Sequence, residues 1–215
     1  LALQPDGKIL IGGNFARVGE TYQNSIARLE TNGAVDPTFN SALDAYAWFY
    51  TLTPQADGKV LVATDSGLDR LMPDGRRDTN FQRFSAFQWI TNAGGMTSAN
   101  NSIRSIAELG DGKILLGGEI QAIEGLALGA GLIRLNPDGT WDQSFHGFTN
   151  WGVSTLLVQP DGQIVIGRNG RLARLNVDGT MDDTFASPTI EGDVMALARQ
   201  PDGKILMGGY YQRAA

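Results

Sequence analysis

Few side chains of this sequence could carry out chemistry. Its 215 residues include no cysteine and one histidine, His146. A thiolate nucleophile, a disulfide framework and a metal site with several histidine ligands are therefore excluded. His146 follows Phe145 with no serine or carboxylate at the spacing of a nucleophilic site, which indicates a solvated loop histidine rather than a general base. We assign no catalytic residue.

Acidic turns offer a second kind of chemistry, the binding of a cation. The segments N-P-D-G-T-W-D at 136–142 and N-V-D-G-T-M-D-D at 176–183 are rich in the oxygen ligands that Ca²⁺ prefers. They lack the D-x-D-x-D-G order and the distal glutamate of an EF-hand loop. Turn formation alone accounts for their Asn and Asp residues. We therefore predict no metal site and no cofactor, with calcium at these turns as the alternative.

Aromatic side chains could bind a ligand by stacking. Phe87 and Trp89 lie in a stretch, residues 84–102, that joins aromatics to Gly, Asn, Ser and Thr, a mixture typical of adaptable binding loops. Trp48 and Trp151 fall in the corresponding segments of two other copies of an internal repeat. These four side chains are our candidates for holding a sugar or a peptide. The leading interpretation is that they fill gaps between neighbouring sheets, because large aromatic side chains are usually buried.

The composition narrows the range of partners. The 42% hydrophobic content allows a buried core, and the net charge of −6 disfavours nucleic acid, whose phosphates select a basic surface. No stretch reaches the ~18 consecutive apolar residues that span a membrane. Both ends interrupt a repeating pattern, so we expect the polypeptide to continue at both ends.

An internal repeat must position these side chains. The sequence Q-P-D-G-K-I-L-I-G-G at 4–13 returns, with substitutions, at 55–64, 110–118, 159–167 and 200–209. Its Asp-Gly glycines are spaced by 51, 54, 50 and 41 residues, about 49 on average. The run after each Asp-Gly is short, rich in β-branched residues and apolar on both faces, which predicts a strand between two layers. Asp-Gly itself favours a tight hairpin turn with the glycine in the left-handed conformation.

A second block follows each of the first four copies. It reads I-A-R-L-E-T-N-G-A-V-D-P-T-F from residue 26 and recurs without insertion or deletion from residues 68, 132 and 172. A hairpin around its glycine places each arginine opposite an aspartate, in pairs that we expect to fix the strand register. The predicted ion pairs are Arg28–Asp36, Arg70–Asp78, Arg134–Asp142 and Arg174–Asp182. We interpret these aspartates as structural.

The two hairpins give each copy about four short strands, and no segment shows the 3.6-residue period of a helix. Repeats of this length with four strands each are typical of β-propellers. We therefore predict an all-β propeller, with a β-solenoid-like array as the alternative. We expect one repeat domain over 1–215, with copies at about 1–47, 48–101, 102–152 and 153–192 and a partial fifth at 193–215.

The doubled motif resembles the delta-60 repeat family. Q-P-D-G-K-I-L-I-G-G followed by I-A-R-L-x-x-x-G-x-x-D-x-T-F is similar to that repeat over nearly the whole chain. The second copy departs from the pattern, because Ala63 and Thr64 replace its two glycines. The resemblance implies a β-propeller-like repeat from a large bacterial protein, secreted or at the cell surface. It brings no catalytic residues with it.

These inferences predict a non-enzymatic structural or adhesive module of a larger bacterial protein, extracellular or at the cell surface. Its partners would be other protein domains or surface glycans, bound by the aromatic segments. A lectin-like propeller that uses the three tryptophans Trp48, Trp89 and Trp151 is the first alternative. The second is a propeller enzyme, a lyase or hydrolase, with a carboxylate outside the ion pairs such as Glu119, Glu124 or Glu191.

Overall fold

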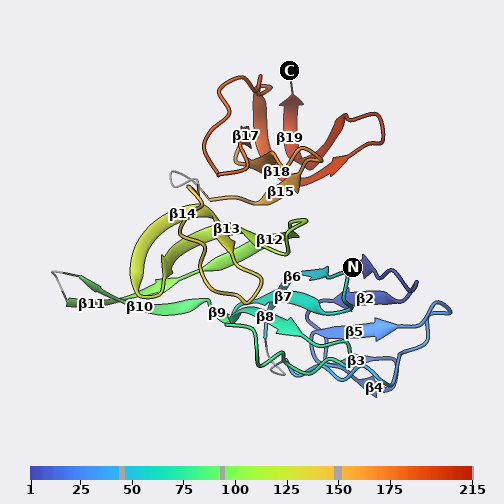
Figure 1. Ribbon diagram of the computed structural model, residues 1–215. Coiled ribbons are helices and arrows are strands. Elements are labelled where there is room, and N and C mark those ends of the chain that lie inside the picture. Colours follow the sequence, from blue (N-terminus) through green and yellow to red (C-terminus); the bar gives the residue numbers. More distant parts are fainter. Residues whose placement is uncertain (44–46, 93–94, 148–151, 215) are drawn as a thin grey trace. The chain divides into compact units, whose positions relative to one another are not determined.

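Strands and their connecting turns make up the computed structural model, which describes residues 1–43, 47–92, 95–147 and 152–214 (Figure 1). No helix occurs within these ranges. Each copy of the repeat forms its own antiparallel sheet. The all-β prediction is therefore confirmed. The chain divides into two compact units, residues 1–87 and 88–215, and the expected single repeat domain over 1–215 stays a prediction.

Unit 1 contains the first two copies. Copy 1 forms a three-stranded sheet in the order β1-β2-β5, with a small sheet, β3–β4, in the loop between its last two strands. Copy 2 forms a four-stranded sheet in the order β6-β7-β8-β9. The strands are β1 Ala2–Leu3, β2 Ile9–Gly12, β3 Arg17–Val18, β4 Thr21–Tyr22, β5 Ile26–Leu29, β6 Phe49–Pro54, β7 Val60–Thr64, β8 Gly67–Leu71 and β9 Phe84–Ser85.

Unit 2 contains the remaining copies and an additional two-stranded hairpin, β10–β11. The first residue of β10, Phe87, is the last residue of unit 1, and the rest of the hairpin belongs to unit 2. Copies 3 and 4 form three-stranded sheets, β12-β13-β14 and β15-β16-β17, and copy 5 forms the two-stranded sheet β18-β19. The strands are β10 Phe87–Asn92, β11 Gly95–Asn100, β12 Ser102–Glu108, β13 Ile114–Ile123, β14 Leu126–Leu135, β15 Thr155–Val158, β16 Ile164–Arg168, β17 Arg171–Leu175, β18 Ile190–Arg199 and β19 Ile205–Ala214.

The first hairpin of each copy closes through its Asp-Gly turn. Leu3 pairs with Ile9, which is the register that such a turn predicts. Gln4 N donates to Lys8 O at 2.8 Å, and Gly7 N donates to Gln4 O at 3.0 Å. Gly7 adopts a φ of 84°, and the corresponding glycines of the other copies have φ between 80° and 89°. A side chain would strain that left-handed conformation, so the turn requires glycine.

The second hairpin of each copy is shorter than the sequence predicts. After the third strand, the chain pairs through one isolated bridge: Leu29–Val35, Leu71–Arg77, Leu135–Trp141 and Leu175–Met181. Among the described residues, a fourth strand is found in copy 2 alone. This strand, β9, follows the bridge in sequence and pairs with Gly67 and Leu68. The predicted four strands per copy are thus three strands and a bridge in most copies.

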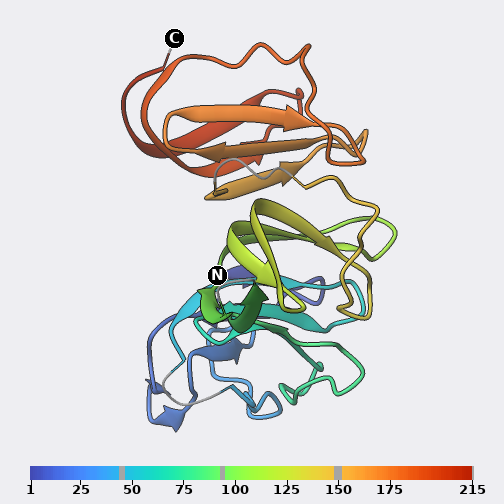
Figure 2. The ribbon, with the colours of Figure 1, turned by 90° about the vertical axis from the view of Figure 1, so that its left-hand side faces the viewer.

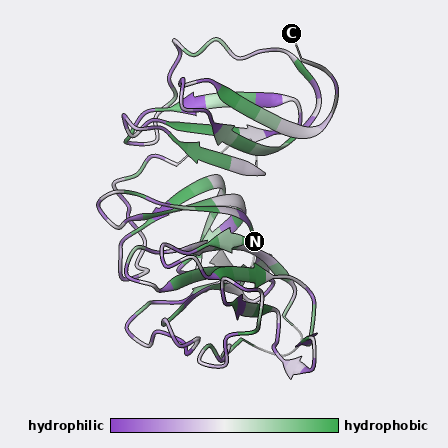
Figure 3. Cartoon of the chain, turned by 90° about the vertical axis from the view of Figure 1, so that its right-hand side faces the viewer, coloured by the Kyte–Doolittle hydropathy of each residue, from purple (hydrophilic) through white to green (hydrophobic). Residues whose placement is uncertain are grey.

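Neighbouring sheets pack face to face through aliphatic side chains. All five residues of β7 are buried, as expected for a strand with a layer on each face. Figure 3 shows the hydrophobic stretches along the strands and the hydrophilic ones in the connecting turns. First strands of successive copies lie side by side, β1 next to β6 in unit 1 and β15 next to both β12 and β18 in unit 2. Within each unit, successive sheets therefore share a core.

One glycine in copies 1, 3 and 4 makes room for a side chain of the next copy, in what we call a glycine slot. A Cβ on Gly12 would collide with the ring of Phe49. A Cβ on Gly117 would lie 2.9 Å from Cγ1 of Val153, and one on Gly167 would lie 2.8 Å from Cγ1 of Val194. The three entering side chains occupy one position of the repeat, six residues before the glutamine of the Asp-Gly turn.

Within the described part of the chain, no helix has the length and apolar character needed to cross a membrane.

Filling a glycine slot should destabilise the protein. We expect Gly117→Ala to lower the free energy of unfolding by about 1–3 kcal/mol, because the added methyl group overpacks a close-packed core. Gly110→Ala is the control, since nothing lies within 4 Å of its Cβ position. Its effect should stay within about 0.5 kcal/mol. Urea denaturation followed by tryptophan fluorescence measures the free energy of unfolding of both variants. Equal midpoints would contradict the prediction that the glycine slot at Gly117 has no room for a methyl group.

Candidate functional site

All four Arg–Asp pairs predicted from the second block are present in the structure. In each pair, the arginine Nε lies 2.7–2.9 Å from the aspartate Oδ2. The backbone sets this geometry, because the aspartate N–H donates to the arginine carbonyl across the hairpin, at 2.8 Å for Asp36 and Arg28. The two side chains therefore leave opposite strands at the same level. Three of the four aspartates are at least nine-tenths buried as whole residues: Asp36, Asp78 and Asp142.

Two of the arginines, Arg28 and Arg134, also link their copy to the next one in the same unit. Arg134 Nη1 donates to Val177 O in the following copy at 2.9 Å, and Arg28 Nη1 donates to Pro73 O at 2.7 Å. The guanidinium of Arg134 also lies 4.7 Å from the ring centroid of Phe145, within the range of a cation–π interaction. The same stacking occurs in the other three blocks, at 4.6–5.0 Å. This stacking accounts for the invariant spacing between arginine and phenylalanine.

The first block contributes a third member to this cluster. Lys8 Nζ donates to Asp36 Oδ2 at 2.7 Å, and Lys113 Nζ donates to Asp142 Oδ2 at 2.9 Å. Gln163, which replaces the lysine in copy 4, donates from Nε2 to Asp182 Oδ2 at 3.1 Å. The Asp-Gly-Lys turn of one hairpin is thus fastened to the aspartate of the next.

These hydrogen bonds hold the aspartates ionised. Burial alone would raise the pKa of Asp36, but hydrogen bonds from Lys8, Thr38 and Arg28 outweigh it and keep that pKa well below its usual range. Asp142 behaves in the same way. Hydrogen bonds from Thr184, and then from Arg174, lower the pKa of Asp182 to about 2. A carboxylate whose oxygens already accept several hydrogen bonds, and whose pKa is low, is well suited to a structural role. It is poorly suited to proton transfer.

The acidic turns use their oxygens internally. Asp138 Oδ1 accepts hydrogen bonds from N and Oγ1 of Thr140, at 3.0 and 2.7 Å. Asp178 and Thr180 repeat this arrangement. The described residues contain no group of three or more His, Cys, Asp or Glu side chains that could hold a metal ion. Calcium at these turns remains an untested alternative.

Of the four aromatic candidates, the structure describes Trp48, Phe87 and Trp89, and ligand binding by them stays a prediction. Trp48, 63% exposed, immediately precedes β6 in unit 1, and its main-chain N–H donates to Asp65 Oδ1 at 3.0 Å. Phe87 and Trp89 are 49% and 57% exposed and lie on β10. Trp151 lies outside the described residues. Between the sheets of copies 1 and 2, Phe49 fills such a gap by entering a glycine slot.

The β10–β11 hairpin is fastened at its base by a buried asparagine. Asn101, 5% exposed, accepts hydrogen bonds from Gln121 N and Ala122 N at 2.8 and 3.0 Å and donates to Ala122 O at 2.8 Å. Asn100 N donates to Gln121 Oε1 at 3.1 Å. The hairpin extends from this base beyond the sheet β12-β13-β14 (Figure 1), and Figure 2 shows it nearly end-on. The base of the hairpin is therefore held by hydrogen bonds to strand β13.

One face of the hairpin is exposed and apolar. Gln88 Oε1 accepts a hydrogen bond from Gly125 N at 3.3 Å, so this side chain faces the β13–β14 turn. Because side chains alternate along a strand, Phe87 and Trp89 leave β10 on the opposite face. Strand β11 adds Met96, which is 66% exposed. No charged residue occurs from residue 84 to residue 103.

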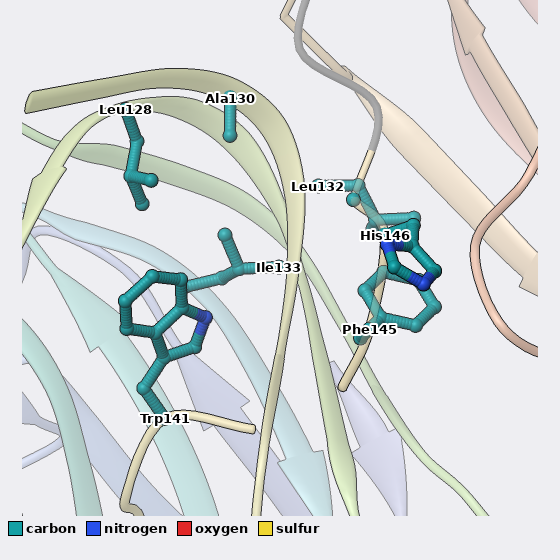
Figure 4. Close-up of a pocket in the computed structure, with 8 residues that line it drawn as sticks. Leu128, Ala130, Leu132, Ile133, Trp141, Phe145 and His146 are labelled. Atoms are coloured by element: carbon teal, nitrogen blue, oxygen red, sulfur yellow. The ribbon is translucent and has the colours of Figure 1, made fainter. Parts of the chain in front are cut away.

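A hollow of about 310 Å³ lies beside strand β14 in unit 2 (Figure 4). Leu128, Ile133 and Trp141 line it on one side of the strand, and Phe145 and His146 lie on the other. His146 is exposed, and its main-chain N–H donates to Asp178 O at 2.8 Å. The lining offers apolar surface and one imidazole, without a second catalytic group among its residues.

The carboxylate of Glu119, named above for an enzyme, is paired with arginine. Glu119 Oε1 lies 2.5 Å from Arg168 Nη2 and 3.7 Å from Arg104 Nη2. Arg168 in turn lies against Gly152, where a Cβ would collide with its guanidinium. Next to it, Asn169 N donates to Asp193 Oδ1 at 2.6 Å. This network is polar and internally satisfied.

Sequence reasoning missed three contributors. The lysine of the Asp-Gly-Lys turn recurs in four of the five copies, which indicates a repeated role. Its partner, the aspartate of the second block, is too distant in sequence to be recognised from the spacing. Met96 stands in the insertion without a motif around it. Asn101 gave no signal, because an asparagine in a polar loop is commonplace.

The sequence matches a protein family described as a domain of unknown function (DUF5122) β-propeller, at residues 4–39, 55–81, 109–145 and 159–185. Together these segments cover more than half of the chain. They correspond to the four complete pairs of blocks. No curated protein matches the sequence.

Several solved structures share the fold. The extracellular domain of a one-component system from B. thetaiotaomicron is 17% identical with a TM-score of 0.59, and the similarity covers 99% of this chain and 26% of that one. A protein of unknown function from Bacteroides caccae is 13% identical with a TM-score of 0.59, covering 97% and 72%. Virginiamycin B lyase from Staphylococcus aureus is 14% identical with a TM-score of 0.54, covering 97% and 68%. The chain thus spans about a quarter of the first of these proteins. At such identities the likeness shows the fold alone, and with the family match it confirms the predicted β-propeller.

Removing one arginine should disrupt a whole cluster. We expect Arg134→Met to lower the free energy of unfolding by about 3–5 kcal/mol, because Asp142 then loses a buried partner and Val177 O loses its donor. Arg76→Met is the matched control, since Arg76 forms a similar pair with Asp74 but its side chain is 81% exposed. The control should change the free energy by at most ~0.5 kcal/mol. Urea denaturation measures both variants. Equal losses in the free energy of unfolding would contradict a stabilising role of the buried cluster.

The ionised aspartates predict a loss of stability in acid. The unfolded-state pKa of aspartate is about 3.9, and the folded values are lower, about 2 for Asp182. The unfolded chain therefore binds more protons as the pH falls, so this stability is complete above about pH 4 and is lost between about pH 4 and pH 2. Urea denaturation across this range should show the fall, and Asp142→Asn should make it shallower. If the free energy of unfolding of Asp142→Asn fell with pH as steeply as that of the wild type, the ionised aspartates would not be the cause of the acid instability.

Proposed function

Because the chain belongs to the DUF5122 β-propeller family of unknown function, we propose that it is a non-enzymatic structural or adhesive module of a larger bacterial protein, secreted or at the cell surface. In this proposal the repeated sheets form a scaffold, and the β10–β11 hairpin binds a partner. The narrower assignment to delta-60 repeats is part of the same proposal. The extracellular-domain neighbour from B. thetaiotaomicron supports the location.

The exposed face of the β10–β11 hairpin carries this proposal. Soluble proteins seldom expose several large apolar side chains together unless they bind something. Phe87, Trp89 and Met96 are each about half exposed or more on this one hairpin. The hairpin is an insertion rather than part of the repeated scaffold, and the buried Asn101 fastens its base to strand β13. A fastened base with adaptable polar residues around an aromatic anchor suits recognition of a protein surface.

A neutral glycan is the second candidate partner. The hairpin combines Trp89 with the hydroxyl and amide side chains of Thr97, Ser98 and Asn100, and it carries no charge. A flat ring beside neutral donors and acceptors fits a sugar that has an apolar face and hydroxyl groups. The propeller-enzyme alternative has less support, since Glu119 is engaged by two arginines.

Trp89→Ala should weaken binding at the hairpin about tenfold or more, because truncation of an aromatic anchor at the centre of an interface has an effect of that size. Two probes test this: peptides selected from a random-peptide phage library on the wild-type chain, and an array of neutral and acidic glycans. The library is first depleted on a variant in which residues 88–100 are replaced by a short Gly-Ser linker. Binding to peptides supports the leading proposal, and binding to neutral glycans supports the second.

Trp48→Ala is the matched control, since Trp48 is equally exposed but lies in unit 1. It should leave binding at the hairpin unchanged. The hairpin would be overturned as the recognition surface if no peptide were recovered after depletion and if glycans bound the wild type and the linker variant equally or not at all. Because Trp89 is 57% exposed, we expect its variant to unfold at the wild-type temperature, which circular dichroism checks.

A further inference from the structure

Two exposed aromatic side chains flank an inward-facing one at the start of strand β6 in unit 1. Trp48 is 63% exposed and Tyr50 is 46% exposed, while the ring of Phe49 between them enters the glycine slot at Gly12. Because side chains alternate along an extended chain, Trp48 leaves the backbone on the side opposite Phe49. Tyr50 is the extra residue of a β-bulge, since the register shifts between Phe49 and Thr51. Bulges re-aim side chains and are frequent beside functional sites.

The scaffold does not require aromatic side chains at these two positions. The position of Trp48 holds Ser102, Gly152 and Asp193 in copies 3, 4 and 5, and the position of Tyr50 holds Arg104, Ser154 and Met195. The aromatic pair is thus a departure of copy 2 from the rest of the repeat. Two large aromatic side chains exposed next to each other are better explained by binding than by packing.

The backbone between the two rings is fastened from both sides. Phe49 N donates to Asn14 Oδ1, in the loop of copy 1, at 3.0 Å. On the other side, Trp48 N donates to Asp65 Oδ1 at 3.0 Å, and Asp65 N donates to Trp48 O at 2.9 Å. The rings are therefore presented from a backbone that is already ordered, which reduces the entropy lost on binding a ligand.

A strained residue contributes to this fastening. Ser25, which is 2% exposed, has a φ of 60°, a left-handed conformation that residues other than glycine seldom adopt. Its Oγ donates at 2.9 Å to the carbonyl of Ala47, the residue before Trp48. Strain of this kind persists where the surrounding structure imposes it, and it is found preferentially at active sites and ligand clamps.

Asp65 places a carboxylate beside Trp48. It is exposed and forms no ion pair with the residues that the structure describes. Arg83, whose Nη2 donates to the carbonyl of the adjacent Ser66 at 3.3 Å, is paired with Asp69 instead, at 3.2 Å. The charge of Asp65 therefore stays available to a ligand. A carboxylate next to aromatic rings selects a cation, because the faces of the rings also carry negative potential.

We propose that Trp48, Tyr50 and Asp65 bind a quaternary ammonium group, of the kind that choline carries. The rings attract the cation through their faces, and the carboxylate complements its charge. A methylated ammonium suits rings that are half exposed, whereas the compact ammonium of lysine holds its water strongly and would bind less well here. The site lies in unit 1 and the β10–β11 hairpin almost wholly in unit 2, so this proposal does not depend on the proposed function.

A titration of the isotope-labelled chain with choline chloride tests the site. The indole N–H signals of the four tryptophans report on it by NMR, and Trp48→Ala identifies the signal of Trp48. We expect this signal to shift until the site saturates, at constant ionic strength with sodium as the exchanged cation, while the other signals stay in place. The neutral analogue of choline, with a tert-butyl group in place of trimethylammonium, should bind about fivefold or more weakly.

Two variants separate the contributions of charge and ring. Asp65→Asn keeps an acceptor for Trp48 N but removes the charge, and Tyr50→Ala removes one ring. Each should weaken choline binding about threefold or more. Tyr210→Ala is the matched control, since Tyr210 is 80% exposed but lies in unit 2, and it should leave the binding unchanged. Circular dichroism checks that the variants melt as the wild type does.

The source of the ammonium group follows from a further arm, co-sedimentation with phosphatidylcholine vesicles. Sedimentation that Trp48→Ala reduces supports the proposal with a lipid headgroup as the ligand, and a response to free choline alone supports it with a soluble compound. A Trp48 signal that choline does not move would overturn the proposal. Equally tight binding of the neutral analogue or of N-acetyl-lysine methylamide would also overturn it, as would an Asp65→Asn variant that binds choline like the wild type.

Discussion

A carboxylate withdrawn from water destabilises a fold unless hydrogen bonds replace its hydration, and this requirement organises every complete copy of the repeat. Asp36 illustrates how it is met. Arg28 approaches from the opposite strand, Lys8 from the preceding turn and Thr38 from the residues that follow. Three segments of the copy are therefore ordered together or not at all. Since Arg28 also donates to Pro73 O, the same ion pair extends order into the next copy.

Packing between copies follows from a complementary device, the absence of a side chain. Gly12, Gly117 and Gly167 leave space that a neighbour fills. The buried carboxylate fixes the strand register within a copy. The glycine slot fixes where a side chain of the next copy packs. Interfaces of this kind are local, so the stability of such an array is expected to be close to a sum of copy and nearest-neighbour contributions. In copy 2 the corresponding position holds Ala63 in place of glycine, and this residue is completely buried.

The regular features of this molecule could be predicted from the sequence because they depend on short-range geometry. The Asp-Gly turn dictates the pairing of Leu3 with Ile9, and the spacing of Arg28 and Asp36 dictates their ion pair. The fourth strand could not be predicted correctly, since the second hairpin continues for only one bridge before the chain turns away. The aromatic site was harder still. Trp48 and Trp89 appear equivalent when counted along the repeat, yet Trp89 lies on an added hairpin whose position depends on the unremarkable Asn101.

The lack of charge between residues 84 and 103 has a kinetic consequence. Long-range attraction speeds association only when both surfaces carry charge. The β10–β11 hairpin adds no charge of its own to such steering, so any attraction of a partner there would come from the rest of the chain, whose net charge is −6. Without steering, association proceeds at about 10⁵–10⁶ M⁻¹s⁻¹. Differences in affinity between partners must then arise in how slowly they leave. If the hairpin is the recognition surface proposed above, attachment through it would depend on how long a partner stays bound more than on charge at the contact itself.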